Sequence, residues 1–205
     1  MEKIRKVENH VSGKGIFTKA TFPVLILGIG LAVFQQFCGI NVVFNYTTNI
    51  FKSIGADATE QLLQAVYISL ANLVFTLVAM TLVDRWGRRP LMLLGAGGLA
   101  VLYLVIGYLL FIKSGNGLTW FILSAIGIYA MSLAPLTWVL ISEIFPNHIR
   151  GKAVSVAVIA LWAAYFILVF TFPMIEKRFG DAAAFWGYAL ICAGGFVFLW
   201  FRLPE

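Results

Sequence analysis

The chain has 205 residues, of which 61 % are hydrophobic and 12 % are charged, and its mean hydropathy is +0.92. Soluble domains carry about 45–50 % apolar residues and about a quarter charged residues, so this composition excludes an ordinary soluble domain. The apolar content equally excludes a disordered chain. At about 20 apolar residues per membrane span, the length predicts an integral membrane protein with six or seven spans.

Six long windows of the sequence contain no charged residue, and every formally charged residue lies between them or at the ends. Each window is long enough to cross a hydrocarbon core of about 30 Å as a helix. The sequence therefore predicts an all-α membrane protein, in which residues 20–205 form one six-helix transmembrane domain and residues 1–19 form a polar cytoplasmic linker. The predicted spans cover residues 22–51, 61–83, 90–112, 118–142, 153–175 and 183–201.

The lysine and arginine residues predict how these spans are oriented. An even number of spans places both ends on one side of the membrane, and eleven of the fifteen Lys and Arg residues lie on that side. The positive-inside rule therefore places both termini in the cytoplasm. Because this charge is spread over membrane-surface loops without a contiguous basic stripe, nucleic acid is not expected as a partner.

The first span is unusually polar for a membrane helix. Asn41 and Asn45 share one helical face, whereas Gln35 and Gln36 would point elsewhere on a straight helix. Gly39 lies between the two pairs, and a break at this glycine would bring both pairs onto one cavity. Discontinuous helices of this kind form substrate sites near the bilayer midplane in transporters.

Other spans repeat this pattern more weakly, with Asn72 in the second, Trp138 near the helix-kinking Pro135 in the fourth, and Trp162 in the fifth. Amides donate and accept hydrogen bonds in fixed geometry, and an indole presents an apolar face with one N–H. With no charged group inside any span, this chemistry fits a neutral polyhydroxylated solute such as a sugar, and not an ion, a phosphate or an amino acid. The alternative is that the same amides only join helices to one another.

Enzyme and metal chemistry have no candidate residues in this sequence. No nucleophile–base pair, carboxylate pair, HExxH motif or phosphate-binding loop occurs, so we expect no catalytic residue, no cofactor and no enzyme activity. Cys38 and Cys192 lie inside spans without metal-ligand spacing and are interpreted as small packing residues. His10 and His148 have no second ligand at useful spacing, so no metal site is predicted.

Four motifs occur in the order and spacing of one known family. They are Gln35-Gln36-Phe37-Cys38-Gly39-Ile40-Asn41, Asp84-Arg85-Trp86-Gly87-Arg88-Arg89, Pro135-Leu136-Thr137-Trp138 and Ser142-Glu143-Ile144-Phe145-Pro146. On these motifs the chain resembles the C-terminal six-helix half of the sugar porter family of the major facilitator superfamily. The likeness is greatest to bacterial proton-linked (symport) xylose and hexose transporters, and it runs from about residue 20 to the end.

The resemblance implies which residues bind substrate and which gate the carrier. Positions that contact sugar in the family are matched by Gln35, Gln36, Asn41, Asn72 and Trp138. Asn45 in the first span and Trp162 in the fifth are added as substrate-binding candidates. A cytoplasmic charge network holds the two halves of such carriers together when they are open outward. Its positions are matched by Asp84, Arg88, Glu143 and Arg150.

Several positions depart from the family pattern. Where the family has a pair of tyrosines after its GIN motif, this chain has Phe44-Asn45-Tyr46, so an amide replaces one aromatic residue. The family pattern W-x-x-N in the fifth span is present as Trp162-Ala163-Ala164-Tyr165, and Leu161 stands where the xylose-type members have glutamine. Two polar positions of the fifth span are therefore expected to be lost, which bears on the identity of the sugar. Ala134 replaces a family glycine.

The expected function is transport of a neutral monosaccharide, xylose- or glucose-like, by alternating access across the bacterial inner membrane, with this chain as the C-terminal half of the carrier. The proton-coupling carboxylate of family symporters lies in the other half, and no Asp or Glu occurs within any predicted span here. The expected partners are the sugar, the lipid bilayer and either an N-terminal six-helix half or a second copy of this chain. The alternatives are a homodimeric carrier and a non-transporting fragment or sugar sensor.

Overall fold

The computed structural model describes residues 21–115 and 117–202, and the predicted linker over residues 1–19 lies outside the described residues. Every regular element of the described chain is a helix. The helices are α2 (Phe22–Phe37), α3 (Ile40–Ser53), α4 (Ala58–Trp86), α5 (Arg88–Phe111), α6 (Leu118–Met131), α7 (Leu133–Glu143), α8 (Arg150–Phe179) and α9 (Asp181–Arg202).

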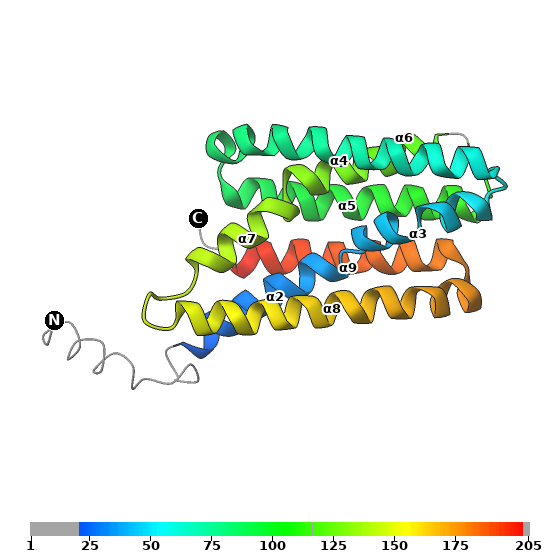
Figure 1. Ribbon diagram of the computed structural model, residues 1–205. Coiled ribbons are helices and arrows are strands. Elements are labelled where there is room, and N and C mark those ends of the chain that lie inside the picture. Colours follow the sequence, from blue (N-terminus) through cyan, green and yellow to red (C-terminus); the bar gives the residue numbers. More distant parts are fainter. Residues whose placement is uncertain (1–20, 116, 203–205) are drawn as a thin grey trace, which may run out of the picture.

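These helices form six membrane-length rods that run along a common axis (Figure 1). The pairs α2–α3 and α6–α7 each make one broken rod, and α4, α5, α8 and α9 make one rod each. The prediction of six apolar helices long enough to cross a membrane is confirmed. α2 begins and α9 ends at the same end of the bundle, as an even number of crossings requires (Figure 1).

The continuous helices α4 and α8 extend beyond the apolar windows that predicted them. α4 begins with a capping box, in which the Asp57 carboxylate accepts from the backbone N–H of Glu60 at 2.7 Å and the Glu60 carboxylate accepts from the backbone N–H of Asp57 at 3.2 Å. α8 continues through Lys177 and Arg178 in its last turn. Positive side chains there interact favourably with the helix dipole, so charged residues lengthen a helix that apolar windows alone end too early.

The first span breaks at Gly39, as the sequence predicts. Gly39 has φ = 86°, a left-handed conformation that side-chain-bearing residues rarely adopt. A Cβ atom at this position would also lie 2.4 Å from Cγ of Tyr188 on α9. Glycine is therefore required at this position for two reasons: the left-handed backbone turn and the close approach of α9.

The fourth span breaks at Ser132, three residues before the proline that predicted a kink. Ser132 has φ = −128° and ψ = −85°, and α7 starts at the next residue. A proline ring clashes with the carbonyl group four residues earlier, here that of Met131, so α6 cannot continue through Pro135. Because Pro135 falls in the first turn of α7, where backbone N–H groups lack helical partners, its missing N–H costs no hydrogen bond.

The proline inside α8 is compensated from a neighbouring helix. Pro173 has no N–H to donate to the carbonyl group of Val169, one turn earlier. The hydroxyl of Tyr46 on α3 donates to this carbonyl oxygen at 2.9 Å, and the Tyr46 ring packs on Phe172 with 4.8 Å between ring centroids. α3 is therefore anchored to α8 at the point where α8 lacks its own hydrogen bond.

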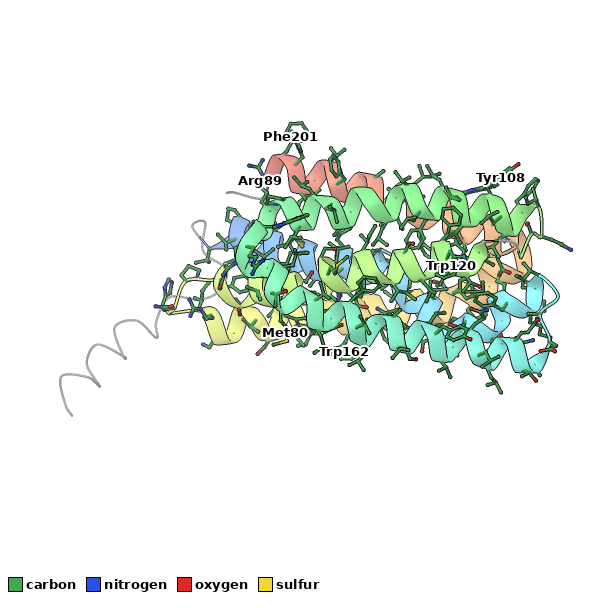
Figure 2. All side chains as sticks on the ribbon, turned by 90° about the horizontal axis from the view of Figure 1, so that it is seen from above. Met80, Arg89, Tyr108, Trp120, Trp162 and Phe201 are labelled. Atoms are coloured by element: carbon green, nitrogen blue, oxygen red, sulfur yellow. The ribbon has the colours of Figure 1, made fainter. Side chains whose placement is uncertain are left out.

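The core and the outer surface of the bundle are both apolar. The most extensive contacts join α5 with α9, α2 with α8, and α4 with α6. Outside, Met80, Trp120 and Phe201 are 71–78 % exposed, and the Phe201 ring projects outward from α9 (Figure 2). Such a surface is stable in lipid and not in water, which agrees with the composition.

Candidate functional site

A chain of hydrogen bonds joins the two broken spans close to their breaks. The Gln35 side-chain nitrogen Nε2 donates to the hydroxyl of Tyr129 on α6 at 2.6 Å. Gln36 Nε2 donates to Gln35 Oε1 at 2.7 Å, and Asn41 Nδ2 donates to Gln36 Oε1 at 2.5 Å. Since the two glutamines precede Gly39 and Asn41 follows it, the break brings both polar groups together, as the sequence predicts.

This polar chain is buried at one end and open at the other. Gln35 and Gln36 are 4 % and 6 % exposed, Asn41 is half-buried, and Asn45 is exposed. A buried amide costs free energy unless its donors and acceptors are paired, and each of the two glutamines donates a hydrogen bond of 2.7 Å or less. The inner amides are thus fixed in place, whereas the outer amides remain accessible to a solute.

The network extends from α3 to α8 through the next amide. Asn45 Nδ2 donates to the backbone oxygen of Asn41 at 2.7 Å and to the Tyr165 hydroxyl at 3.1 Å. Tyr165 in turn contacts Trp162 edge-to-face, with 5.6 Å between ring centroids. Trp162 is 58 % exposed, so an indole surface lies at the open end of the polar chain.

The structure places the remaining substrate candidates on other helices. Asn72 lies half-buried on α4, and its backbone oxygen accepts a hydrogen bond from Thr76 at 2.6 Å. Trp138 lies on α7 and is 46 % exposed. The network from Trp162 to Tyr129 does not include either side chain within the described part of the chain.

Two of the four predicted gating charges form an ion pair. Arg88 at the start of α5 and Glu143 at the end of α7 bind each other through Nη1 and Oε2, and both side chains are nearly half exposed. Arg150 Nε donates to the backbone oxygen of Phe145 at 3.2 Å. The side chain of Asp84 lies outside the described part of the structure. The ion pair joins the turn after α4 to the end of the broken fourth span.

Tyr129 belongs to the network but is not among the residues predicted from the sequence. It is the single tyrosine of the fourth span, and a tyrosine hydroxyl inside a membrane needs a hydrogen-bond partner. Tyr165 stands where the family pattern has asparagine, and its hydroxyl bonds to Asn45 across the helix pair. Whether this position faces a sugar stays a prediction.

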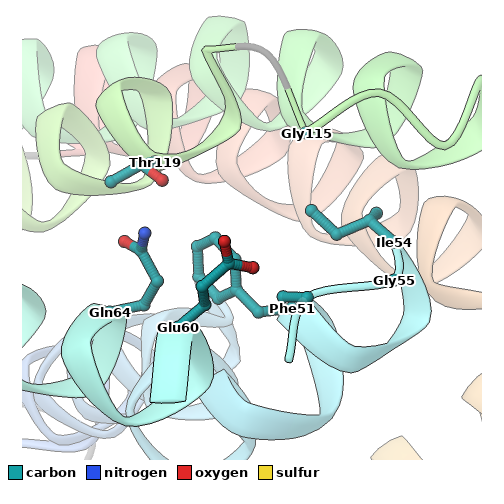
Figure 3. A pocket seen from close by; sticks show the side chains of 8 residues that line it. Phe51, Ile54, Gly55, Glu60, Gln64, Gly115 and Thr119 are labelled. Atoms are coloured by element: carbon teal, nitrogen blue, oxygen red, sulfur yellow. The ribbon is translucent and has the colours of Figure 1, made fainter. Parts of the chain in front are cut away.

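A separate pocket of about 300 Å³ lies at the end of the bundle where α3 passes into α4 (Figure 3). Glu60, Gln64 and Thr119 line it, over an apolar wall that includes Phe51. Glu60 already caps α4, and none of these residues belongs to the hydrogen-bonded network. This pocket is therefore distinct from the candidate site.

The arrangement supplies neutral hydrogen-bond donors and acceptors beside exposed aromatic rings. Asn41 and Asn45 offer amide groups, Tyr165 offers a hydroxyl that both donates and accepts, and Trp162 offers an apolar face. Sugars present hydroxyl groups around a ring with apolar C–H faces, which these groups complement. No charged side chain takes part in the described network.

Comparison with known proteins gives consistent matches over the chain. The profile of the family described as "Sugar (and other) transporter" matches residues 1–205. The D-xylose-proton symporter of Escherichia coli (strain K12) is 39 % identical over 189 residues, covering 89 % of this chain and 38 % of the relative. The glucose facilitated diffusion protein of Zymomonas mobilis subsp. mobilis is 35 % identical over 202 residues, covering 95 % of this chain and 42 % of the relative.

A solved structure agrees with both sequence matches. The major facilitator superfamily proton:xylose symporter XylE bound to 6-bromo-6-deoxy-D-glucose superposes with a TM-score of 0.80 at 38 % identity, covering 88 % of this chain and 40 % of that protein. The chain thus spans less than half the length of the relatives that it matches. The profile match over residues 1–205 and these similarities show that the chain belongs to the sugar transporter family, with the fold of the major facilitator superfamily.

Proposed function

We propose that this chain supplies the C-terminal six-helix half of a carrier that moves a neutral monosaccharide, xylose- or glucose-like, across a membrane by alternating access. The relatives are named for the transport of xylose or glucose, and this chain covers 38–42 % of their length. An N-terminal six-helix half is the partner that would complete the carrier.

One observation carries this proposal: the hydrogen bond between Gln35 and Tyr129 joins the two broken spans beside their breaks. Burying a polar side chain within a membrane span costs free energy, and here such side chains are concentrated where the helix backbone is broken. Such a site binds substrate in transporters whose halves rock around it. Gln36, Asn41, Asn45 and Trp162 extend the proposed sugar site from this point, and Asn72 and Trp138 would reach the sugar from α4 and α7.

The proposal also includes a surface for the partner half and a gating role for four charged residues. α4 is the least covered of the described spans, with 11 % of its apolar window buried, so its face is available to lipid or to an N-terminal half. Arg88 and Glu143, with Asp84 and Arg150, would hold the two halves together on the cytoplasmic side. We expect no transport by this chain alone, and transport when an N-terminal half is present with it.

The proposed location is the bacterial inner membrane, with both termini in the cytoplasm. Single cysteines at exposed positions test the orientation, because Cys38 and Cys192 are fully buried and resist labelling. A membrane-impermeant maleimide should label Thr59→Cys in intact cells and should label Asn147→Cys only after lysis. The reverse pattern would contradict the orientation.

Sugar binding is tested by thermal unfolding of the purified chain in detergent. A ligand at 100 times its Kd stabilises a protein by about 2.7 kcal/mol, which corresponds to roughly 5–10 °C for a chain of this size. D-xylose or D-glucose should raise the unfolding midpoint, and gluconate, which carries a negative charge, should not. Gln36→Ala should abolish the shift, and Thr76→Val on α4 should preserve it.

Uptake into proteoliposomes tests the need for a partner. The chain alone is expected to give no uptake above empty vesicles, with the full-length E. coli D-xylose-proton symporter as the positive control. Uptake by the chain alone at a comparable rate would overturn the proposal of a half-carrier. Failure of both sugars to shift the unfolding midpoint would overturn the proposal of a sugar site.

A further inference from the structure

Asn45 on α3 and Tyr165 on α8 form a reciprocal contact between helices that are 120 residues apart in sequence. Asn45 Nδ2 donates to the Tyr165 hydroxyl at 3.1 Å, and this hydroxyl lies 3.4 Å from Asn45 Oδ1, to which it can donate in return. Asn45 Nδ2 carries two hydrogens, and the second serves the backbone oxygen of Asn41 at 2.7 Å. The pair therefore uses both ends of the amide and both functions of the hydroxyl.

The contact lies at the accessible end of the candidate site. Asn45 is exposed, Tyr165 is half-buried, and the Trp162 ring meets the Tyr165 ring edge-to-face. One residue further along α3, Tyr46 is anchored to the Val169 backbone oxygen of α8. The position of α3 beside Asn45 is thus held by this anchor, while the direction of the Asn45 amide and of the Trp162 ring depends on Tyr165.

We propose that Asn45 and Tyr165 act as one pair, in which Tyr165 is a positioning residue that orients the Asn45 amide and the Trp162 ring toward a bound sugar. This inference rests on the proposed sugar site. The reciprocal contact needs one amide and one phenol, so substitution of either residue alone removes that combination.

The pair is tested by a double-mutant cycle on apparent sugar affinity, measured by equilibrium dialysis of labelled D-xylose and D-glucose with the purified chain. Asn45→Tyr and Tyr165→Asn should each weaken binding about tenfold, a change typical of losing one positioned hydrogen bond. The double variant N45Y/Y165N, which restores one amide and one phenol, should bind within about threefold of the unchanged chain. Independent sites would instead give a double variant about a hundredfold weaker, which would overturn the pair.

Two further variants separate positioning from general stability. Tyr165→Phe keeps the ring and removes only the hydroxyl, and it should weaken binding several-fold. Tyr108→Phe is the matched control, because Tyr108 points outward from α5 and is 58 % exposed (Figure 2). The control should leave sugar affinity unchanged. Equal effects of the two substitutions would overturn the positioning role.

The unfolding midpoints of the same variants distinguish the failure of this inference from that of the proposed function. Coupling between positions 45 and 165 in the midpoints, together with no sugar binding by the unchanged chain, would overturn the sugar site and with it the positioning role. Sugar binding by the unchanged chain with additive losses in affinity would overturn the Asn45–Tyr165 pair alone. Coupling in both midpoint and affinity is the result expected.

Discussion

The amides of the broken first span and the hydroxyls of the continuous helix α4 differ in where they find hydrogen-bond partners. On α4, the hydroxyls of Ser69 and Thr76 donate to backbone oxygens of their own helix at 2.9 Å and 2.6 Å. In the broken first span, Gln35 and Asn45 bond instead to tyrosines of other helices. The windows of the two broken spans are 56 % buried, and that of α4 is 11 % buried.

The polar groups of the two regions therefore depend on helix packing to different extents. A hydroxyl that bonds to its own helix is satisfied in any surroundings, so α4 can face lipid or another half without further partners. Amides beside a helix break depend on neighbouring helices, so they fix the relative positions of those helices.

The largest effect is expected at the break itself. Gly39→Ala places a Cβ atom in a left-handed conformation and 2.4 Å from the Tyr188 ring. Strain and overlap together should lower the free energy of unfolding by about 3 kcal/mol, or roughly 6–12 °C in the unfolding midpoint. Gly187→Ala on α9 is the matched control, since a Cβ atom there meets no atom within 4 Å. Similar midpoints for the two variants would remove the structural need for glycine at the break.

Removing the middle of the amide chain should have the next largest effect. Gln36→Ala leaves Gln35 Oε1 and Asn41 Nδ2 without their partner and should lower the free energy of unfolding by about 2 kcal/mol. Ser69→Ala and Thr76→Val on α4 remove hydrogen bonds that stay within one helix and should each change it by about 0.5 kcal/mol or less. Chemical unfolding in detergent measures all three. Equal losses would mean that broken and continuous spans do not differ in this respect.

Removing the hydrogen bond between Tyr46 and α8 should lower the free energy of unfolding by a smaller amount, which depends on whether Pro173 is present. Tyr46→Phe leaves the Val169 backbone oxygen without a donor and should cost about 1 kcal/mol. In a Pro173→Ala background the restored N–H can serve this oxygen, so the same substitution should cost clearly less. Unfolding midpoints of the four proteins give the coupling. Identical costs in both backgrounds would show that the tyrosine does not compensate for the proline.

The exposed ion pair should have the smallest effect on this chain. Arg88→Gln and Glu143→Gln should each change the free energy of unfolding by about 0.5 kcal/mol or less, because solvent screens a pair that is nearly half exposed. The change in the free energy of unfolding should be smaller still at about 0.5 M salt than at about 0.05 M salt. Unfolding at the two salt concentrations measures it. A loss above about 2 kcal/mol that does not depend on salt would contradict a screened surface pair.

Much of the fold was predictable from residue types and spacing. Charge-free windows identify all six long helices because a charge inside lipid is costly, and the glycine between two polar pairs indicates the break in the first span. The helix ends were less predictable, since Asp57 and Glu60 cap α4 with charged side chains that window counting excludes. The break in the fourth span falls at Ser132 because Pro135 acts on the preceding turn.

The candidate site was predictable only in part. Gln35, Gln36 and Asn41 can be identified from the sequence because they are amides in a membrane span. Tyr129 and Tyr165 do not, because a membrane helix tolerates tyrosine at many positions, and only the neighbouring helix shows what the hydroxyl bonds to. All seven residues named as substrate contacts remain predictions, as do the four gating charges.

Hydropathy, charge and glycine act locally along the chain, so residue types and spacing predict the class of protein, the number of spans and the place where the first span breaks. Which polar groups meet depends on how the helices pack against one another. Asn45 and Tyr165 are separated by 120 residues and come together through the packing of α3 on α8, as do Tyr46 and the backbone oxygen that Pro173 leaves without a donor. Hydrogen bonds between helices depend on packing distances and directions, which no single segment contains.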